Sequence, residues 1–271
     1  FPFTGNKFEY RAVGASANCA QALTVLQTAV ADQLNNFIFS VNKKMEKGLD
    51  AQTAIVSTLQ KLLEGTEKII FNGNGYSEEW QAEAKKRGLS NNKRASDALS
   101  AYLSERSARL FAATGVLTPN ELLARYEIAA ESYVKTMELE ATTMIEMAQT
   151  QVIPSVNEYF NKLTISCQSQ SEVSFKFENI KNMQLNVNSN AIHKMLDHLN
   201  KMYEMTAELK SNLVTLHQIE KTQGIDEALK FAGSTIKETM AELRLAGDAL
   251  ELLVGAKYWN LPTYRELLLN L

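Results

Sequence analysis

The longest regular pattern near the N-terminus is a run of apolar residues at intervals of three and four. Its members are Leu23, Leu26, Val30, Leu34, Phe37, Val41 and Met45. This spacing places them along one side of an α-helix of about seven turns, as a stripe that faces a protein core. Gly48 ends the pattern, and Asp50 can cap a second helix that reaches about Ile70. The pattern therefore predicts two consecutive helices, the first with a buried stripe.

Turn residues divide the middle of the chain into further helices. The stretch Asn72-Gly73-Asn74-Gly75 is dense in residues that tolerate a positive φ, so we expect a loop there. A short helix is expected over 78–86 and a longer one over about 96–114. Thr118-Pro119-Asn120-Glu121 then combines a capping threonine, a proline at the first helical position and a glutamate that closes a capping box. It predicts a new helix.

The helix that begins at Thr118 is expected to continue to about Leu163, with a kink at Pro154. Proline lacks an amide hydrogen and crowds the preceding turn, which distorts a helix at that point. Residues 164–190 are rich in Ser, Gln and Asn, and they are interpreted as a surface excursion with a short strand in Val173-Ser174-Phe175-Lys176-Phe177. Helical periodicity returns from Ile192 and pauses at Gly224. The fold class is therefore mainly α, a helical bundle preceded by a strand.

The strand is predicted from Lys7-Phe8-Glu9-Tyr10-Arg11. Successive side chains of an extended chain point to opposite faces, so Phe8 and Tyr10 share one face. Lys7, Glu9 and Arg11 share the other. An ordinary strand would turn its aromatic face to the core and its charges to water. The alternation alone leaves open whether the charged face meets water or a ligand.

Composition and charge exclude several classes of protein. The chain of 271 residues carries a net charge of −3, which argues against a protein that binds nucleic acid through a basic surface. No apolar run reaches the roughly 18 residues of a membrane span, and no signal peptide is recognisable. Two cysteines, Cys19 and Cys167, are too few for a disulfide scaffold or a four-ligand zinc site, which predicts a reducing, cytosol-like compartment. Because the first residue is Phe1, we expect the chain to be part of a longer protein.

Other candidate chemistry is weak. His193 and His198 are five residues apart, so they cannot form the i, i+4 ligand pair of a zinc helix, and His217 stands alone. Six methionines fall at helical spacing in 137–147 and 195–205, and core filling explains them better than a cofactor site. The Asn-Gly-Asn-Gly loop lacks the lysine of a phosphate-binding loop. Residue patterns alone thus indicate a helical protein with a strand at its front.

The strand and the turn after it resemble a known family. Lys7-Phe8-Glu9-Tyr10-Arg11, followed by Ala15-Ser16-Ala17-Asn18 and a long helix, is similar to the basic-x-Glu-x-Arg strand near the end of the glutamine synthetase catalytic domain. Several further segments resemble the type III branch of that family. They are Phe71-Asn72-Gly73-Asn74-Gly75-Tyr76-Ser77-Glu78-Glu79-Trp80, Glu83-Ala84-Lys85-Lys86-Arg87-Gly88-Leu89, Leu110-Phe111, Gly115-Val116, Arg125-Tyr126-Glu127 and Leu261-Pro262-Thr263-Tyr264-Arg265-Glu266-Leu267-Leu268.

The resemblance implies an activity and a role for each charged residue. Glutamine synthetases make glutamine from L-glutamate, ammonia and ATP through γ-glutamyl phosphate, with Mg²⁺ or Mn²⁺ between carboxylates and phosphates. Glu9 would be a metal ligand, Arg11 would bind the glutamate side chain and its phosphate, and Lys7 would face the ATP phosphates. Lys7 stands where many relatives carry arginine, and lysine lacks the bidentate fork. Asn18 would shape the turn after the strand and is not a catalytic candidate.

The resemblance also implies how the chain is organised. Residues 1–150 would form the C-terminal end of an α+β catalytic domain, and 151–271 the helical extension of type III enzymes, with 164–190 at its surface. The expected assembly is a homo-oligomer, a cytoplasmic dodecamer of two stacked hexameric rings, to which the extension contributes. One glutamate cannot hold two or three metal ions, so these 271 residues alone are expected to be inactive.

Two other interpretations stay open. A non-catalytic helical-bundle interaction or assembly module would explain the periodicity but gives no reason for Lys7, Glu9 and Arg11 on one face. Another family of ATP-dependent carboxylate ligases would share the metal chemistry but not the Asn-Gly-Tyr-Ser-Glu-Glu-Trp segment.

Overall fold

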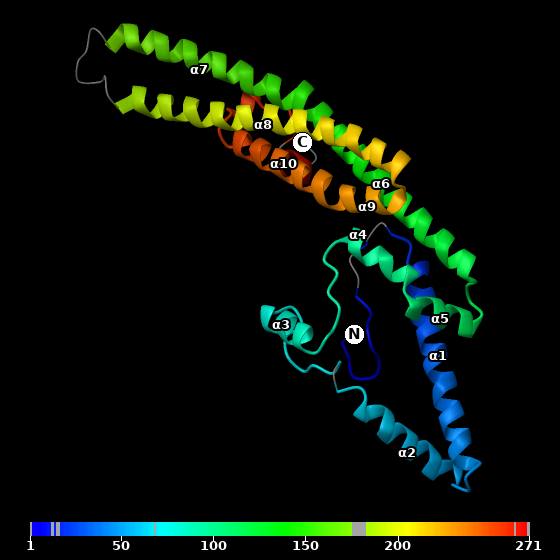
Figure 1. The fold of residues 1–271 in the computed structure, drawn as a ribbon. Coiled ribbons are helices and arrows are strands. Elements are labelled where there is room, and N and C mark those ends of the chain that lie inside the picture. The colour runs from blue at the N-terminus through cyan, green and yellow to red at the C-terminus, as the bar shows by residue number, and fades with distance from the viewer. Residues whose placement is uncertain are drawn as a thin grey trace. The chain divides into compact units, whose positions relative to one another are not determined.

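The computed structural model shows a chain made almost entirely of helices (Figure 1). It describes residues 2–11, 14, 17–67, 69–174, 183–262 and 264–269. Among these residues the β structure is limited to one isolated antiparallel bridge between Phe3 and Phe8. The mainly α fold class predicted from the sequence is thus confirmed.

The chain divides into two compact units. The first comprises Phe1–Asn92 and Ser100–Arg125, and the second comprises Lys93–Leu99 and Tyr126–Leu271. This division describes how the chain packs on itself. The predicted division near residue 150, between catalytic domain and extension, concerns function and stays a prediction.

The first unit is built on a long helix, α1 (Ala20–Met45), which packs against α2 (Ala51–Glu64) and α5 (Glu105–Thr114). The predicted cap of α2 is confirmed, because the Asp50 side chain accepts a hydrogen bond from the backbone N–H of Thr53. A short helix, α3 (Glu78–Lys86), begins after Ser77 as expected.

The single helix predicted over 96–114 is wrong. The structure has α4 (Ala95–Ala98), a 3₁₀ segment η1 (Leu99–Leu103) and then α5. Ser104 separates them, because its Oγ accepts a hydrogen bond from the Ser107 N–H at 3.2 Å and so caps a new helix.

The predicted burial of the α1 stripe is also wrong, although the helix itself is confirmed. Of the seven apolar residues in the stripe, Val41 alone is buried, at 8% exposure, whereas Val30 and Leu34 are 57% and 56% exposed. The physical reason is that α2 and α5 are the helices packed on α1 in this unit, and they cover only part of its length. A large apolar strip of α1 therefore remains at the surface.

The helix predicted from Thr118 forms as α6 (Pro119–Met147), continues through a π-helical turn η2 (Ala148–Val152) and extends as α7 (Ile153–Ser174). The capping box is confirmed, because Thr118 N–H donates to Glu121 Oε2 at 2.8 Å and Glu121 N–H donates to Thr118 Oγ1 at 3.3 Å. The π turn lies immediately before Pro154. A widened turn accommodates a missing helical hydrogen bond, which explains how the helix continues past the proline.

The interpretation of 164–190 as a surface excursion with a strand is wrong where the structure describes it. α7 continues to Ser174, and the next helix, α8, spans Met183–Thr222. Residues 175–182, which include most of the expected strand, lie outside the described residues. Serine, asparagine and glutamine lower helix propensity only slightly, and packing between long helices outweighs that preference.

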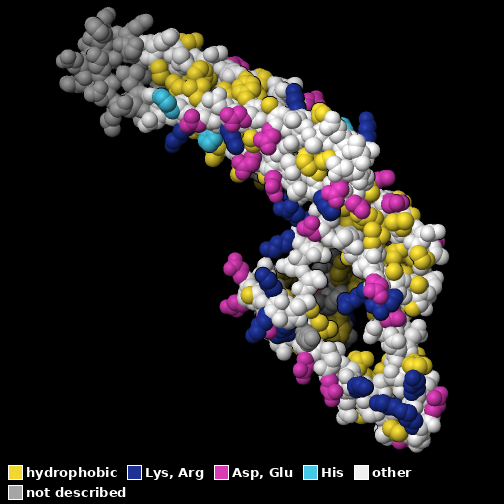
Figure 2. All heavy atoms as spheres, viewed as in Figure 1, with side chains coloured by type: hydrophobic (Ala, Val, Ile, Leu, Met, Phe, Trp, Pro, Cys, Tyr) yellow, Lys and Arg dark blue, Asp and Glu magenta, His cyan; other side chains and the backbone are white. Residues whose placement is uncertain are grey.

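The second unit is a bundle around α8, which lies against α7 and against α10 (Lys237–Glu251) (Figure 1). Between α8 and α10 come α9 (Ile225–Phe231) and a second π turn, η4 (Ala232–Ile236). The largest fully buried residues belong to this bundle: Met195, Leu209, Leu216, Leu229, Ile236, Leu243, Leu250, Val134, Val156 and Ser155. On the face in Figure 2, acidic and basic side chains are interspersed along the bundle, as expected for amphipathic helices.

The chain after α10 turns back along the bundle through η5 (Ala256–Tyr258) and α11 (Tyr264–Leu269). The spacing of Thr263 and Glu266 predicts a capping box for α11, but Thr263 lies outside the described residues. None of the helices described here is both long enough and apolar enough to cross a membrane.

Candidate functional site

The front segment folds back on itself as a tight turn. Thr4 N–H donates to the Lys7 carbonyl at 2.9 Å, and Glu9 N–H donates to the Pro2 carbonyl at 3.0 Å. Gly5 lies at φ +94°, a conformation that side chains with a Cβ rarely adopt. The turn leaves Lys7, Glu9 and Arg11 on one extended stretch.

The structure brings the three predicted site residues together. Arg11 donates to one oxygen of Glu9, with Nη2–Oε2 at 2.9 Å and Nε–Oε2 at 3.2 Å. Lys7 Nζ lies 3.9 Å from the other oxygen, Glu9 Oε1. The carboxylate is thus held between two cations, and its side chain is 33% exposed, against 67% for Lys7 and 57% for Arg11. The cluster carries an excess positive charge that faces outward, as an anion-binding group would.

The aromatic face of this segment, Phe8 and Tyr10, does not pack against a core among the described residues. Phe8 is 71% exposed and Tyr10 is 53% exposed. The Phe8 ring lies against the Phe3 ring, with centroids 5.1 Å apart. In the described part of the chain, this segment pairs with no strand beyond the Phe3–Phe8 bridge. The described residues therefore form no sheet against which the aromatic face could pack.

Tyr76 joins this cluster, which the sequence did not predict. Hydrogen bonds from the guanidinium to Glu9 and then to Tyr76 raise the pKa of Arg11 above its usual value. Tyr76 is 85% exposed and follows the Asn-Gly-Asn-Gly loop. The loop was recognised as a turn, but a turn prediction is local and carries no information about which distant residue it contacts.

An aromatic stack supports the loop that carries Tyr76. The Phe71 ring stacks on Trp80 with centroids 4.3 Å apart, and the Arg87 guanidinium lies 5.6 Å from the Trp80 ring on α3. Arg87 Nη1 also donates to the Ile70 carbonyl at 2.8 Å, which ties α3 to the chain before the loop. The Arg87 ion pair lowers the pKa of Glu83.

The loop itself is closed by local hydrogen bonds. Asn74 Oδ1 accepts from Tyr76 N–H at 3.0 Å, and the Asn74 carbonyl accepts from Ser77 N–H at 3.1 Å. Ser77 Oγ in turn accepts from Trp80 N–H at 3.3 Å and caps α3. A Cβ at Gly73 would lie 2.5 Å from the Phe71 ring, so glycine is required for the loop to wrap this ring. Segments that carried the type III resemblance are thus explained as one packed structure.

The described residues do not by themselves form a metal site. No three His, Cys, Asp or Glu side chains come together within the described ranges. Glu9 offers one carboxylate, and both of its oxygens already face cations, whereas Mg²⁺ takes about six oxygen ligands. Asn18 is placed as expected for a residue that shapes the turn, because its Oδ1 accepts from Ala20 N–H at 2.8 Å at the start of α1.

Comparison with known proteins shows which proteins this chain is similar to. Residues 54–171 match the family model described as the glutamine synthetase C-terminal domain. Over 99% of its length the chain is 31% identical to a glutamine synthetase from Bacteroides fragilis (strain YCH46), of which it covers 36%. It is 32% identical over 99% of its length to a type-3 glutamine synthetase from Dictyostelium discoideum, again covering 36%. The chain is also 31% identical, over all of its length, to a glutamine synthetase from Butyrivibrio fibrisolvens. It covers 37% of that relative.

These matches confirm the family resemblance that the sequence motifs predicted. The chain is similar to glutamine synthetases through nearly its whole length. A type-3 enzyme is among these relatives. The chain spans just over a third of the length of the curated relatives.

Proposed function

We propose that this chain is the C-terminal part of a type-3 glutamine synthetase subunit, a ligase that joins L-glutamate and ammonia at the expense of ATP. The observation that carries the proposal is the Lys7–Glu9–Arg11 cluster in a chain whose homologues are glutamine synthetases over 99–100% of its length. A helical module without catalytic function would have no use for a carboxylate fixed between two exposed cations.

In this proposal each charged residue acts on an anion or a cation of the reaction. Arg11 presents a guanidinium fork, which suits the side-chain carboxylate of glutamate and the phosphate that replaces one of its oxygens. Lys7 provides a point charge for ATP phosphates. Glu9 keeps the Arg11 fork in place and contributes one oxygen toward Mg²⁺ or Mn²⁺, which would neutralise phosphate charge when bound. Phosphoryl transfer of this kind depends mostly on positioning and charge neutralisation.

The remaining site residues belong, in this proposal, to the two-thirds of the relatives' length that this chain does not match. Two surfaces support it. The apolar stripe of α1, with Val30 and Leu34 more than half exposed, is unusual for a free surface. The Phe8–Tyr10 face is likewise exposed. We expect both to be covered in the full-length protein, and we expect the 271 residues alone to be inactive.

The experiment is a coupled assay of glutamine formation on the full-length protein with Arg11→Lys. Lysine keeps the charge but loses the bidentate fork, so we expect KM for glutamate to rise about tenfold or more. Arg109→Lys is the matched control, because Arg109 is also an exposed arginine of the first unit paired with a glutamate, Glu105, at 3.7 Å. Unchanged kinetics for Arg11→Lys, or equal losses in the two variants, would refute the assignment.

We also propose that the bundle of the second unit serves assembly into a homo-oligomer, with two stacked hexameric rings as the expected form. The amphipathic helices and exposed apolar residues of this unit, such as Leu245 at 62% and Leu252 at 88%, suit subunit contacts. Deleting 164–271 from the full-length protein should yield smaller species in light scattering. Intact dodecamers after the deletion would count against this role.

A further inference from the structure

A cavity of about 660 Å³ opens on the second unit between α6, α8, α10 and the segment after η5. Its volume falls within the range of small-molecule sites, which is about 300–1,000 Å³. The π turn η2 forms part of its wall through Ala148 and Val152. π turns widen the helix locally and are frequent at binding sites. Nothing in the proposed ligase reaction uses this cavity.

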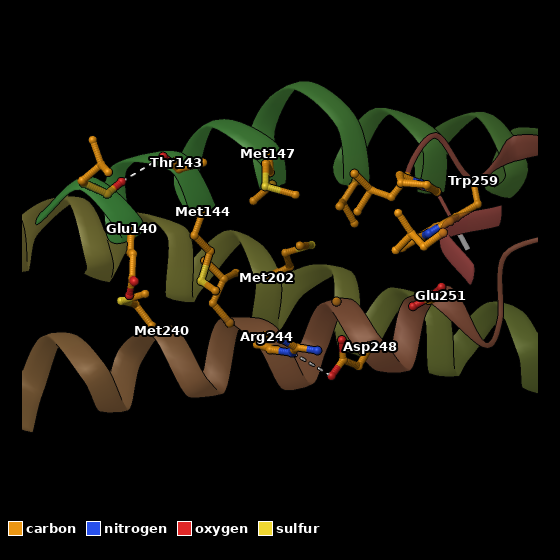
Figure 3. Close-up of a pocket in the computed structure, with 18 residues that line it drawn as sticks. Glu140, Thr143, Met144, Met147, Met202, Met240, Arg244, Asp248, Glu251 and Trp259 are labelled. Carbon is orange, nitrogen blue, oxygen red and sulfur yellow. Dashed lines mark hydrogen bonds and ion pairs between the residues drawn. The ribbon is translucent and has the colours of Figure 1, made fainter. Parts of the chain in front are cut away.

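Methionine side chains from three helices converge on the cavity (Figure 3). Met144 and Met147 come from α6, Met202 comes from α8 and Met240 from α10. The expectation of core filling is confirmed for Met137, Met195, Met202 and Met205, each at most 8% exposed. Met147 instead is 37% exposed. Unbranched, polarizable methionines adapt their shape to apolar ligands.

The C-terminal segment closes one end of the cavity with an aromatic residue. Trp259 is half-buried and lies near Glu251 of α10 (Figure 3), and Leu261, Pro262 and Leu267 continue the apolar wall. An indole and a carboxylate that line the same cavity attract organic cations, because the ring face and the carboxylate are both negative.

The charges around the cavity are unbalanced. Of the described residues, three carboxylates (Glu140, Asp248 and Glu251) and one guanidinium (Arg244) line it. Arg244 Nε lies 3.3 Å from Asp248 Oδ2, so this cation is engaged. Glu140 and Glu251 form no ion pair within the part of the chain described here. Among the described residues, the cavity thus joins an apolar interior to two carboxylates that form no ion pair.

We infer that this cavity binds a small organic cation with an apolar body, whose positive nitrogen lies by Glu251 and Trp259 and whose apolar part lies against the methionines. The volume suits a compact molecule rather than a long peptide. Charge complementarity sets the class, because an anionic amphiphile would meet Glu140 and Glu251 as like charges.

The test uses the full-length protein and three probes of equal chain length: octyltrimethylammonium, 1-octanol and octanoate. Isothermal titration calorimetry should show saturable binding of octyltrimethylammonium. The affinity for 1-octanol should be about tenfold lower than that for the cation, and the affinity for octanoate should be the lowest of the three. Absence of saturable binding of the cation would overturn the inference. Octanoate binding as tightly as the cation would overturn it as well.

Variants locate the binding. Glu251→Gln should weaken octyltrimethylammonium about tenfold while leaving 1-octanol unchanged, since only the cation uses the carboxylate. Glu146→Gln is the matched control, an exposed glutamate of α6 that does not line the cavity, and it should change neither affinity. Equal effects of the two variants would overturn the inference.

A filling variant tests the apolar part. Met147→Trp adds volume from a position that is already partly exposed, so the bundle should tolerate it, and both octyltrimethylammonium and 1-octanol should lose affinity. Circular dichroism checks that the variant is folded. Unchanged binding in a folded Met147→Trp, or tight binding of a basic amphipathic peptide in place of the small cation, would overturn the assignment.

Discussion

The phenol of Tyr126 donates a hydrogen bond to Asp226 Oδ1 at 2.6 Å, joining α6 to α9 across 100 residues of sequence. Tyr126 is 5% exposed, and Asp226 lies in the first turn of α9, where a carboxylate also offsets the positive end of the helix. Tyr126 is part of the Arg-Tyr-Glu segment that contributed to the family resemblance. The contact gives this segment a structural role within the second unit.

We predict that Tyr126→Phe destabilises the protein by about 1–3 kcal/mol, because it removes a buried hydrogen bond to a charged acceptor. Urea unfolding at pH 7 measures the loss. Tyr203→Phe is the control, since Tyr203 is 49% exposed on α8, and it should cost less than about 0.5 kcal/mol. Equal stability of the two variants would contradict the prediction.

The same contact predicts a dependence on alkaline pH. Burial, followed by the hydrogen bond to Asp226, raises the pKa of Tyr126 from 10 to about 12. A group whose pKa is raised by folding contributes stability that is present below its unfolded pKa and is lost as pH rises through the folded value. Between pH 10 and 12 the wild type should therefore lose more stability than Tyr126→Phe, measured by urea unfolding at both pH values. A constant difference across that window would contradict this.

A second pair of helices, α6 and α8, is joined by charges that respond to acid. His217 Nε2 donates to Glu138 Oε1 at 2.6 Å, and Lys135 Nζ lies 3.2 Å from Glu138 Oε2 and 3.3 Å from Glu220 Oε2. The hydrogen bond from His217 and then that from Lys135 lower the pKa of Glu138. A lowered folded pKa contributes stability that is present above the unfolded pKa, near 4.5, and is lost as pH falls through the folded value.

Glu138→Gln should therefore reduce stability at pH 7 by about 1 kcal/mol at most, since the network lies near the surface. The difference from wild type should shrink when unfolding is repeated at pH 3.5. Glu131→Gln serves as the control, because Glu131 is an exposed residue of α6 without a described ion pair, and its effect should be small at both pH values. If the Glu138→Gln difference grew in acid, the assigned direction would be wrong.

Helix ends were predictable from sequence because capping is local. Asp50, Ser77 and Thr118 each accept the backbone hydrogen bond that their position indicated. Burial was less predictable, because it depends on which elements meet. The periodicity of α1 predicts an apolar stripe but not whether another element covers it, and α2 and α5 leave most of the stripe exposed.

The candidate site shows the same limit. Alternation along the chain correctly brought Lys7, Glu9 and Arg11 to one cluster, because residues two apart in an extended chain share a face. The approach of Tyr76 to Arg11 depends on the fold of the loop, and no periodicity signals it. Polar composition at 164–190 predicts a surface excursion, although serine, asparagine and glutamine remain compatible with the long helices that the structure describes up to Ser174 and from Met183.

The loop of the first unit yields a pair of matched substitutions. In Gly73→Ala the new Cβ would lie 2.5 Å from Phe71 Cζ, so the ring must leave its stack on Trp80. We expect the free energy of unfolding to fall by about 0.5–1.5 kcal/mol, which is the contribution of an aromatic pair. The near-ultraviolet circular dichroism signal of the aromatic residues should change as well. Gly75→Ala, two residues along in the same loop, meets no atom within 4 Å and should leave the spectrum unchanged. Identical spectra for wild type and Gly73→Ala would refute the proposed packing.

Two glycines of the second unit should respond to alanine with opposite signs. Gly233 lies in the π turn η4, where a Cβ would clash with the Ser96 side chain, 2.5 Å from its Cβ. Ser96 is 6% exposed and α4 packs on η4, so the Ser96 side chain cannot move away from the new methyl group without disturbing this packing. Gly233→Ala should therefore lower the free energy of unfolding by about 1–3 kcal/mol. Gly247 lies inside α10, where a Cβ meets Met202 Cε at an ordinary 3.6 Å.

Gly247→Ala should therefore stabilise the protein by about 0.5–1 kcal/mol, because alanine has the higher helix propensity and loses less backbone entropy on folding. Urea unfolding of both variants under one set of conditions compares them directly, with α-helix content checked by circular dichroism. The double variant Gly233→Ala/Ser96→Gly separates clash from propensity, because removing the Ser96 side chain makes room for the new methyl group. It should be more stable than Gly233→Ala alone. If it were not, the close approach of α4 to η4 would not be the cause of the loss.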